Sequence, residues 1–178
     1  MMRRLEWLEA EITTDSAFDA FRDAGRVGSY CLSCPQHARS WLCPPLDSAV
    51  IRQLAGFTHV RMIGLQIFTT AADAATPAEA ILAGERRDFE AQLLRLEKEL
   101  GGRACGFSGR CPYCDNTPCA RIAGQPCRHP DLARPSLEAC GFDVTAIASQ
   151  CLHKEILWAR DGVHPPYYML VGAVFHNA

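Results

Sequence analysis

Apolar residues are arranged along the chain in four stretches that favour β-strands. Residues 4–12 alternate loosely between apolar and polar side chains, and residues 58–69 form a dense apolar run rich in β-branched side chains. The second pattern is typical of a strand buried on both faces, so we expect it at the centre of a sheet. A short run at 103–107 and a longer apolar run at 167–175 complete the predicted sheet.

Helical patterns separate these strands. A short helix is predicted to start at 13–15 and to end at Gly25. Residues 76–79 have the form of a capping box, with Pro77 at the first helical position, and they open a long helix to about Leu100. One face of that helix carries large apolar residues, namely Phe89, Leu93, Leu96 and Leu100. Further helices are expected over 47–55, with Asp47 as the cap, from 135 onwards, and within 143–158.

Two segments, 28–45 and 109–135, are rich in cysteine and turn-forming residues and have no clean periodicity. We interpret both as loops. The order of elements predicts one α/β domain over residues 1–178. In this domain helices pack on a single small mixed sheet, and two cysteine-rich metal-binding loops lie together at one end of it.

Composition and charge narrow the class of protein. A hydrophobic content of 48% predicts a folded chain, and a net charge of -2 gives no reason to expect a nucleic-acid partner. The local basic groups, Arg86–Arg87 and the arginines of 121–134, are interpreted as solvated surface. The N-terminus lacks the apolar core of a secretory signal, and no run of roughly 18 apolar residues predicts a membrane span. We therefore expect a cytoplasmic protein.

The ten cysteines are the most informative feature in this setting. Disulfides are rare in a reducing compartment, where clustered cysteines more often bind metal or carry out redox chemistry. The first set is Cys31, Cys34 and Cys43, and the second is Cys111, Cys114, Cys119 and Cys127. In each set, two residues separate the first pair, which lets one tight turn direct both sulfur atoms at one centre. These seven residues are the predicted metal ligands.

The spacing favours iron–sulfur clusters over zinc, because zinc sites usually present two compact pairs. One or two clusters of the 4Fe–4S type are expected, with zinc as the alternative. The first set lacks a fourth cysteine. His37 is a local candidate for this position, and Cys105, Cys140 and Cys151 are distant ones, although Cys140 and Cys151 are by default small buried hydrophobic residues.

The pair Cys111 and Cys114 also matches the redox pair of glutaredoxins. In that fold the pair begins a helix directly after a strand. Pro118 would break such a helix within two turns, and Cys119 and Cys127 would have no role. Thiol–disulfide exchange is therefore the weaker interpretation of this pair.

Three pieces of sequence support the metal hypothesis in combination. They are Cys31-x-x-Cys34 leading to Trp41-x-Cys43-Pro44-Pro45; Cys111-x-x-Cys114 with Cys119; and Cys127-Arg128-His129-Pro130 leading to Pro135-Ser136-Leu137-Glu138-Ala139 and Gly141-Phe142-Asp143-Val144. From about residue 28 to the C-terminus, the chain resembles a family of uncharacterised cysteine-rich proteins, a domain of unknown function described as predicted metal-binding. The chain departs from the family pattern at Cys119, which follows its pair by four intervening residues rather than two. The resemblance implies a metal-binding role, with iron–sulfur favoured, and no particular reaction.

The sequence thus predicts an iron–sulfur protein that transfers electrons or serves as a redox accessory to a partner enzyme. A redox partner protein is expected. Two alternatives stay open: an enzyme with an open three-cysteine iron–sulfur site, and a zinc-stapled structural or interaction module.

Overall fold

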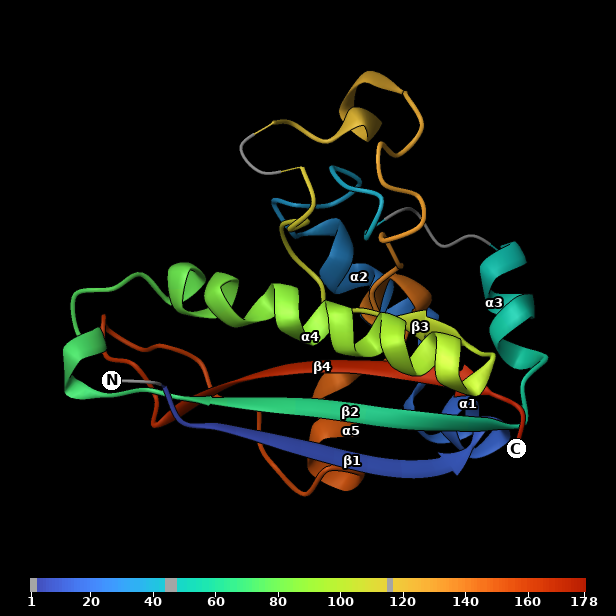
Figure 1. Cartoon of the computed structure of the whole chain (residues 1–178), viewed down its shortest axis with the longest axis horizontal. Helices are drawn as coiled ribbons and strands as arrows, with labels where there is room; N and C mark the ends of the chain where they lie inside the picture. Colours follow the sequence, from blue (N-terminus) through green and yellow to red (C-terminus); the bar gives the residue numbers. More distant parts are fainter. Residues whose placement is uncertain (1–2, 44–47, 115–116) are drawn as a thin grey trace.

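The computed structural model describes residues 3–43, 48–114 and 117–178. Its centre is a four-stranded sheet in the order β1 (Leu5–Thr13), β2 (His59–Phe68), β4 (Tyr167–His176) and β3 (Arg103–Cys105). Figure 1 shows β2 and β4 in the middle of the sheet, as the density of their apolar residues predicts. The α/β class and the single sheet are confirmed. The sheet was expected to be mixed, but every strand pair described is antiparallel.

One face of the sheet is covered by the long helix α4 (Ala78–Leu100). The predicted apolar face is confirmed, because Phe89 and Leu93 are buried against β2 and β4, and Leu96 and Leu100 pack at the border of the same cluster. The helix approaches the sheet closely at Gly172, where an added Cβ would lie 2.6 Å from a Leu93 methyl group.

The C-terminal end of α4 was predicted correctly, and its N-terminal cap was not. The helix ends as predicted at Gly101, which adopts the left-handed conformation (φ 60°) that glycine tolerates best. The predicted capping box over 76–79 does not form, because Pro77 is the N-cap and no side chain caps the helix there. A capping box forms instead six residues earlier, where Thr70 and Asp73 bond reciprocally around the 3₁₀ turn Ala71–Asp73.

The other face of the sheet is covered by α1 (Thr14–Phe21), α3 (Ser48–Ala55) and α5 (Val144–Gln150). The large apolar residues of this cluster include Phe21, Leu54, Phe142 and Phe175. The helix predicted from 47 is confirmed, although its proposed cap, Asp47, lies outside the described residues. The helix expected over 143–158 is shorter and ends at Gln150, and the helix expected from 135 is only the 3₁₀ turn Glu138–Cys140.

One helix was not foreseen. The short helix α1 ends at Phe21 rather than at Gly25, and a second helix, α2, follows over Ala24–Leu32. Asp23 caps α2 by accepting the backbone N–H of Arg26. Val27 is its only buried residue among those described, so α2 has almost no apolar face for sequence periodicity to reveal. Part of the segment read as a loop from residue 28 is therefore helical.

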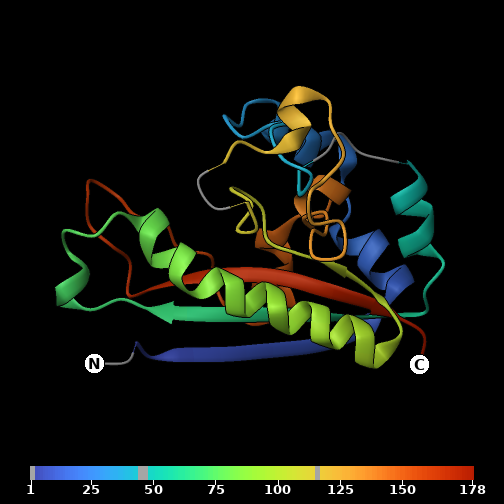
Figure 2. The same cartoon turned by 45° about the horizontal axis from the view of Figure 1, so that its top comes forward.

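Both cysteine segments lie on the same side of the molecule, beyond the edge strand β3 rather than at the strand ends (Figures 1 and 2). Figure 2 shows the second segment folded over the first and over α2. Within the described ranges, no helix combines the length and the apolar composition needed to cross a membrane.

Candidate metal centre

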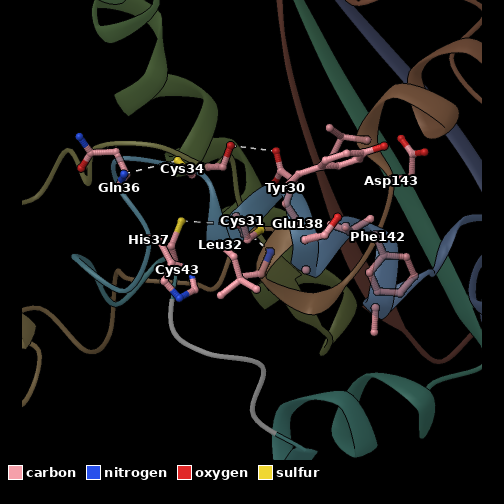
Figure 3. Close-up of a pocket in the computed structure, with 18 of the residues that line it drawn as sticks. Tyr30, Cys31, Leu32, Cys34, Gln36, His37, Cys43, Glu138, Phe142 and Asp143 are labelled. Atoms are coloured by element: carbon pink, nitrogen blue, oxygen red, sulfur yellow. Dashed lines mark hydrogen bonds between the residues drawn. The ribbon is translucent and has the colours of Figure 1, made fainter.

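The first cysteine set follows the end of α2. Cys31 lies in the last turn of this helix, and the backbone N–H of Cys34 bonds to its carbonyl at 3.1 Å. Cys43 is held by a further turn, in which its N–H bonds to the carbonyl of Ser40 at 3.2 Å. Cys34 is exposed, whereas Cys31 and Cys43 are partly buried. All three side chains line one pocket (Figure 3).

Backbone N–H groups point at the sulfur atoms of this set. The N–H of Gln36 donates to Cys34 Sγ at 3.4 Å, and the N–H of Gly109 donates to Cys43. Burial raises the pKa of the Cys43 thiol, whereas the hydrogen bond from Gly109 lowers it to a smaller extent. Burial also raises the pKa of Cys31, and the nearby carboxyl group of Glu138 acts in the same direction. N–H groups directed at sulfur stabilise a thiolate and are typical of cluster-binding loops.

The second cysteine set lies in the loop between β3 and the 3₁₀ turn at Glu138. The N–H of Tyr113 donates to Cys111, and the N–H of His129 donates to Cys127 Sγ at 3.4 Å. Burial raises the pKa of the Cys111 thiol to about 11, and the thiols of Cys114 and Cys119 act in the same direction. Because a bound metal requires thiolates, loading this set would release protons. The segment up to Cys114 contains no helix, which is the element that the glutaredoxin interpretation requires.

The structure brings six of the seven cysteines near other members of their set, whereas Cys127 is described only by its contact with the N–H of His129. Cys31 interacts electrostatically with Cys34 and Cys43, and Cys111 does so with Cys114 and Cys119. Within the described part of the chain, no three Cys, His, Asp or Glu side chains converge as they would around one metal ion. The donor chemistry fits an iron–sulfur or zinc centre, and a single metal ion would require the sulfur atoms of a set to converge further.

Contacts between Trp41 and two residues of the second segment join the two cysteine segments. The indole N–H of Trp41 donates to the carbonyl of Gln125 at 3.2 Å, and the Arg121 guanidinium lies 4.7 Å from the centre of the Trp41 ring. Arg121 also donates to the carbonyl of Ala38 at 3.0 Å. The tryptophan between Cys34 and Cys43 thus fastens the first segment onto the second.

Arginines hold the second segment against the rest of the fold. Arg87 donates to the carbonyl of Pro112 at 3.0 Å, and Arg134 forms a partly buried ion pair with Glu97 at 2.6 Å. Arg86 is buried, with 6% of its surface exposed. The interpretation of these basic groups as solvated surface is therefore wrong for Arg86, which is buried, and for Arg134, whose partly buried partner Glu97 lies far away in the sequence.

Arg86 lies between the two cysteine sets. Its Nη2 donates to the carbonyl of Phe107 at 2.6 Å, and its Nε lies 3.7 Å from Glu90 Oε1. Burial lowers the pKa of Arg86, and the negative charges of Glu90, Cys111 and Cys43 act in the opposite direction. Burial also raises the pKa of Glu90. One buried guanidinium therefore interacts electrostatically with a thiol of each set.

The pocket lined by the first set has a volume of about 780 Å³. It lies between α2 and the segment 136–145, and Trp158 also contributes to its lining. Glu138 contributes a carboxyl group whose Oε1 accepts the Ser108 hydroxyl at 2.8 Å. Its Oε2 is buried without a hydrogen-bond partner, and burial raises the pKa of this carboxyl group.

The candidates for a fourth ligand to the first set differ in whether they lie at the pocket or in the core. His37 lines the same pocket as the three cysteines. Cys105 and Cys140 are buried in the core, with their sulfur atoms 4.0 Å apart, and Cys151 packs at the border of the same cluster. Sequence reasoning missed Glu138, which is also on the pocket wall. Its only sequence signal was its place in the motif from Pro135 to Ala139.

A comparison with models of protein families identifies the family of this chain. Residues 19–172 match the family described as "Predicted metal-binding protein (DUF2284)". The chain belongs to this family. No curated protein matches the chain, and no solved structure matches it either. Membership in DUF2284 confirms the predicted metal-binding family that the cysteine motifs resembled. The identity of the metal has to be argued from the site.

Proposed function

We propose that this DUF2284 protein holds two iron–sulfur clusters and works in electron transfer or as a redox accessory to a partner enzyme. Cys31, Cys34 and Cys43 would hold one cluster. Cys111, Cys114, Cys119 and Cys127 would hold the other. The observation that carries the proposal is that backbone N–H groups donate to sulfur atoms in both sets, from Gln36 and Gly109 in the first set and from Tyr113 and His129 in the second.

The surroundings of the sulfur atoms support iron–sulfur over zinc. In both sets the donors are cysteines, and each set has sulfur atoms that accept backbone N–H groups. Such hydrogen bonds, together with burial and local charge, are the means by which proteins set the potential of a cluster. A structural zinc site has no potential to set, and the same hydrogen bonds would serve there only to offset the thiolate charge.

An iron–sulfur cluster supplies a one-electron carrier, and the chain would determine how readily it accepts the electron. Reduction adds negative charge to a centre already surrounded by thiolates. The positive charge of Arg86 stabilises the reduced state more than the oxidised one, because the site is shielded from water. Arg86 is therefore proposed to raise the potential of both centres and to favour electron exchange between them.

A cytoplasmic location and a redox partner are part of the same proposal. All ten cysteines are free thiols in the structure, which is the state expected in a reducing compartment. Cys34 is exposed, so a partner protein could approach the first centre directly.

Metal and sulfide content of protein purified without oxygen tests this proposal. Two four-iron clusters predict roughly eight irons and eight sulfides per chain, with a brown colour that dithionite bleaches. Cys31→Ser and Cys111→Ser should each remove about half of the iron, whereas Cys151→Ser, at the border of the core, should remove none. Zinc without iron, in colourless protein, would overturn the redox proposal and leave a zinc-stapled module.

A further inference from the structure

β1 forms one outer edge of the sheet, and among the described residues only β2 pairs with it. It runs for nine residues, Leu5–Thr13, without proline or glycine, and its register with β2 is continuous, so it contains no bulge. The cysteine segments lie beyond β3, at the opposite edge of the sheet (Figure 2). A long, regular edge strand is a template for pairing with a strand of another chain.

The strand register shows which backbone groups are available at this edge. The N–H of Phe68 donates to the carbonyl of Arg4 at 3.1 Å, so these two residues form a hydrogen-bonded pair of the antiparallel ladder. Such pairs alternate along a ladder, and the even-numbered residues of β1 therefore bond to β2. The odd-numbered residues direct their N–H and C=O groups outwards, where no described residue bonds to them. These residues are Leu5, Trp7, Glu9 and Glu11.

The same odd-numbered residues present their side chains on the face of the sheet that α4 covers. Trp7 stacks on Phe89 of α4, with the ring centres 5.8 Å apart, and is still 45% exposed. A groove of about 560 Å³ lies between β1 and α4, and its lining includes Trp7 and Glu9 of β1 and Asp88 of α4. A strand added to β1 would cover Trp7 and run along this groove.

The charge of the groove selects the kind of partner. Glu9 and Asp88 are exposed carboxylates with no ion-pair partner in the described part of the chain. Arg95 also lines the groove, but its guanidinium donates to the side chain of Gln92. The lining therefore has a net negative charge, and a positively charged side chain complements it.

A second copy of β1 fits this edge poorly. The strand contains Glu6, Glu9 and Glu11 and neither lysine nor arginine. Self-pairing would bring three carboxylates from each copy into one strip, and like charges opposite each other destabilise strand pairs. The charge of β1 thus disfavours its own copy and favours a strand of opposite charge.

We propose that an extended, basic segment of another protein adds to the sheet beside β1 and places a lysine or arginine in the groove that Glu9 and Asp88 line. The new strand runs antiparallel to β1, as every described strand pair of this sheet does. Its basic residues then direct their backbone groups at β1 and their side chains at α4, because directly opposite residues of a ladder share a face. This surface is separate from the metal centre, so the proposal goes beyond the proposed function and does not depend on it.

The probe is a blocked seven-residue peptide in which lysine and valine alternate, with the same peptide carrying glutamate in place of lysine as the control. Isothermal titration calorimetry on the purified protein should detect binding of the lysine peptide at low ionic strength, and its affinity should fall as salt is added. The glutamate peptide should not bind at about 1 mM. Equal binding of the two peptides, or no binding of the lysine peptide, would overturn the proposal.

N-methylated peptides test whether the backbone takes part. Methylation of two lysine N–H groups should abolish binding, because these groups face β1 in the proposed pairing. Methylation of two valine N–H groups should leave binding intact, because these groups face away from β1. Equal effects of the two modifications would show that the lysine peptide is held by charge alone and would contradict strand addition.

Two variants of Glu9 locate the site on the protein. Glu9→Gln removes the charge and keeps the backbone, so it should weaken binding of the lysine peptide about threefold. Glu9→Pro also removes an outward N–H that β2 does not use, so it should abolish binding and leave the ladder with β2 intact. Glu99→Gln is the matched control, because Glu99 is exposed on α4 outside the groove lining. Unchanged affinity in both Glu9 variants would contradict the assignment of β1.

The oligomeric state separates the proposed partner from a second copy of the chain. Light scattering after size-exclusion chromatography should give a monomer. A dimer that Glu9→Pro dissociates would show that a second copy occupies β1 and would overturn the proposal. None of these measurements depends on iron, so failure of the peptide to bind and failure of the clusters to form are distinguishable in the same samples.

Discussion

Trp41 donates its indole N–H to the carbonyl of Gln125, 3.2 Å away, and so joins two cysteine segments that are far apart in the sequence. The Arg121 guanidinium lies over the same ring and donates to the carbonyl of Ala38. These contacts make the two segments one structural unit, which neither segment could form alone because neither has a regular hydrogen-bonded core.

Replacing this tryptophan tests the connection. Trp41→Phe keeps a ring beneath Arg121 but removes the donor to Gln125, so the free energy of unfolding should fall by about 1 kcal/mol. Urea denaturation of the metal-free protein measures the change. Trp158→Phe is the control, since Trp158 is 70% exposed and should have little effect. Equal stability of wild type and Trp41→Phe would show that the two segments hold together without this hydrogen bond.

Removing Arg86 should be far more damaging than removing an exposed arginine. Arg86→Met leaves Glu90 buried without its ion-pair partner and the Phe107 carbonyl without a donor, so we expect a loss of about 3–5 kcal/mol. The matched control is Arg52→Gln, because Arg52 lies exposed at the end of α3 and should change stability little.

A double variant separates the charge effect from general damage. Arg86→Met with Glu90→Gln removes the unpaired carboxylate but keeps an acceptor for the Phe107 N–H, so part of the lost stability should return. In iron-loaded protein that retains its fold, the midpoint potentials of Arg86→Met should be lower than those of wild type. A higher potential would contradict the electrostatic role of Arg86.

Asp73 gives a pH dependence of stability with a defined sign. The Arg3 guanidinium, at 2.6 Å, and the backbone N–H of Thr70 lower the pKa of this carboxyl group from 3.8 to about 2. A folded-state pKa below the unfolded value contributes stability that is complete above the unfolded pKa. That contribution is lost as the pH falls from about 4 towards 2.

Asp73→Asn should therefore be less stable than wild type at pH 7, and the difference should shrink as the pH falls towards 2. Urea denaturation midpoints at pH 7, 5 and 3 measure the trend. Asp19→Asn, at an exposed position on α1, provides the comparison. A difference that stays constant over this range would mean that the Arg3 pair does not set the effect.

Gly172 tests how closely α4 packs on the sheet. A Cβ at this position would lie 2.6 Å from Leu93 Cδ1 and 2.9 Å from the carbonyl oxygen of Cys105. Gly172→Ala should therefore destabilise the protein by about 1–3 kcal/mol through overpacking. Gly84→Ala, in open space on α4, should instead stabilise it by up to about 1 kcal/mol, because alanine favours a helix. Thermal unfolding of both variants distinguishes the two effects, and a neutral Gly172→Ala would show that α4 can shift away from β4.

Much of the fold follows from local sequence. The strands at 58–69 and 167–175 were predicted because a dense apolar run leaves a strand few alternatives to burial. The end of α4 at Gly101 was predictable because glycine adopts the left-handed conformation there at low cost. The seven cysteines proposed as ligands were also evident from spacing alone, since a tight turn is a local feature.

The tertiary structure decided what depends on distant neighbours. Helix α2 was not predictable from local sequence. The start of this helix is held beside Gly141 and Asp143, which lie far along the chain. The burial of Arg86 and the unpaired oxygen of Glu138 were likewise invisible, since charged residues are normally solvated and the sequence does not reveal which of them are enclosed. Spacing determined which thiols are candidates for metal, whereas the fold decided which charges and which pocket surround them, because electrostatic and packing partners are set by proximity in space.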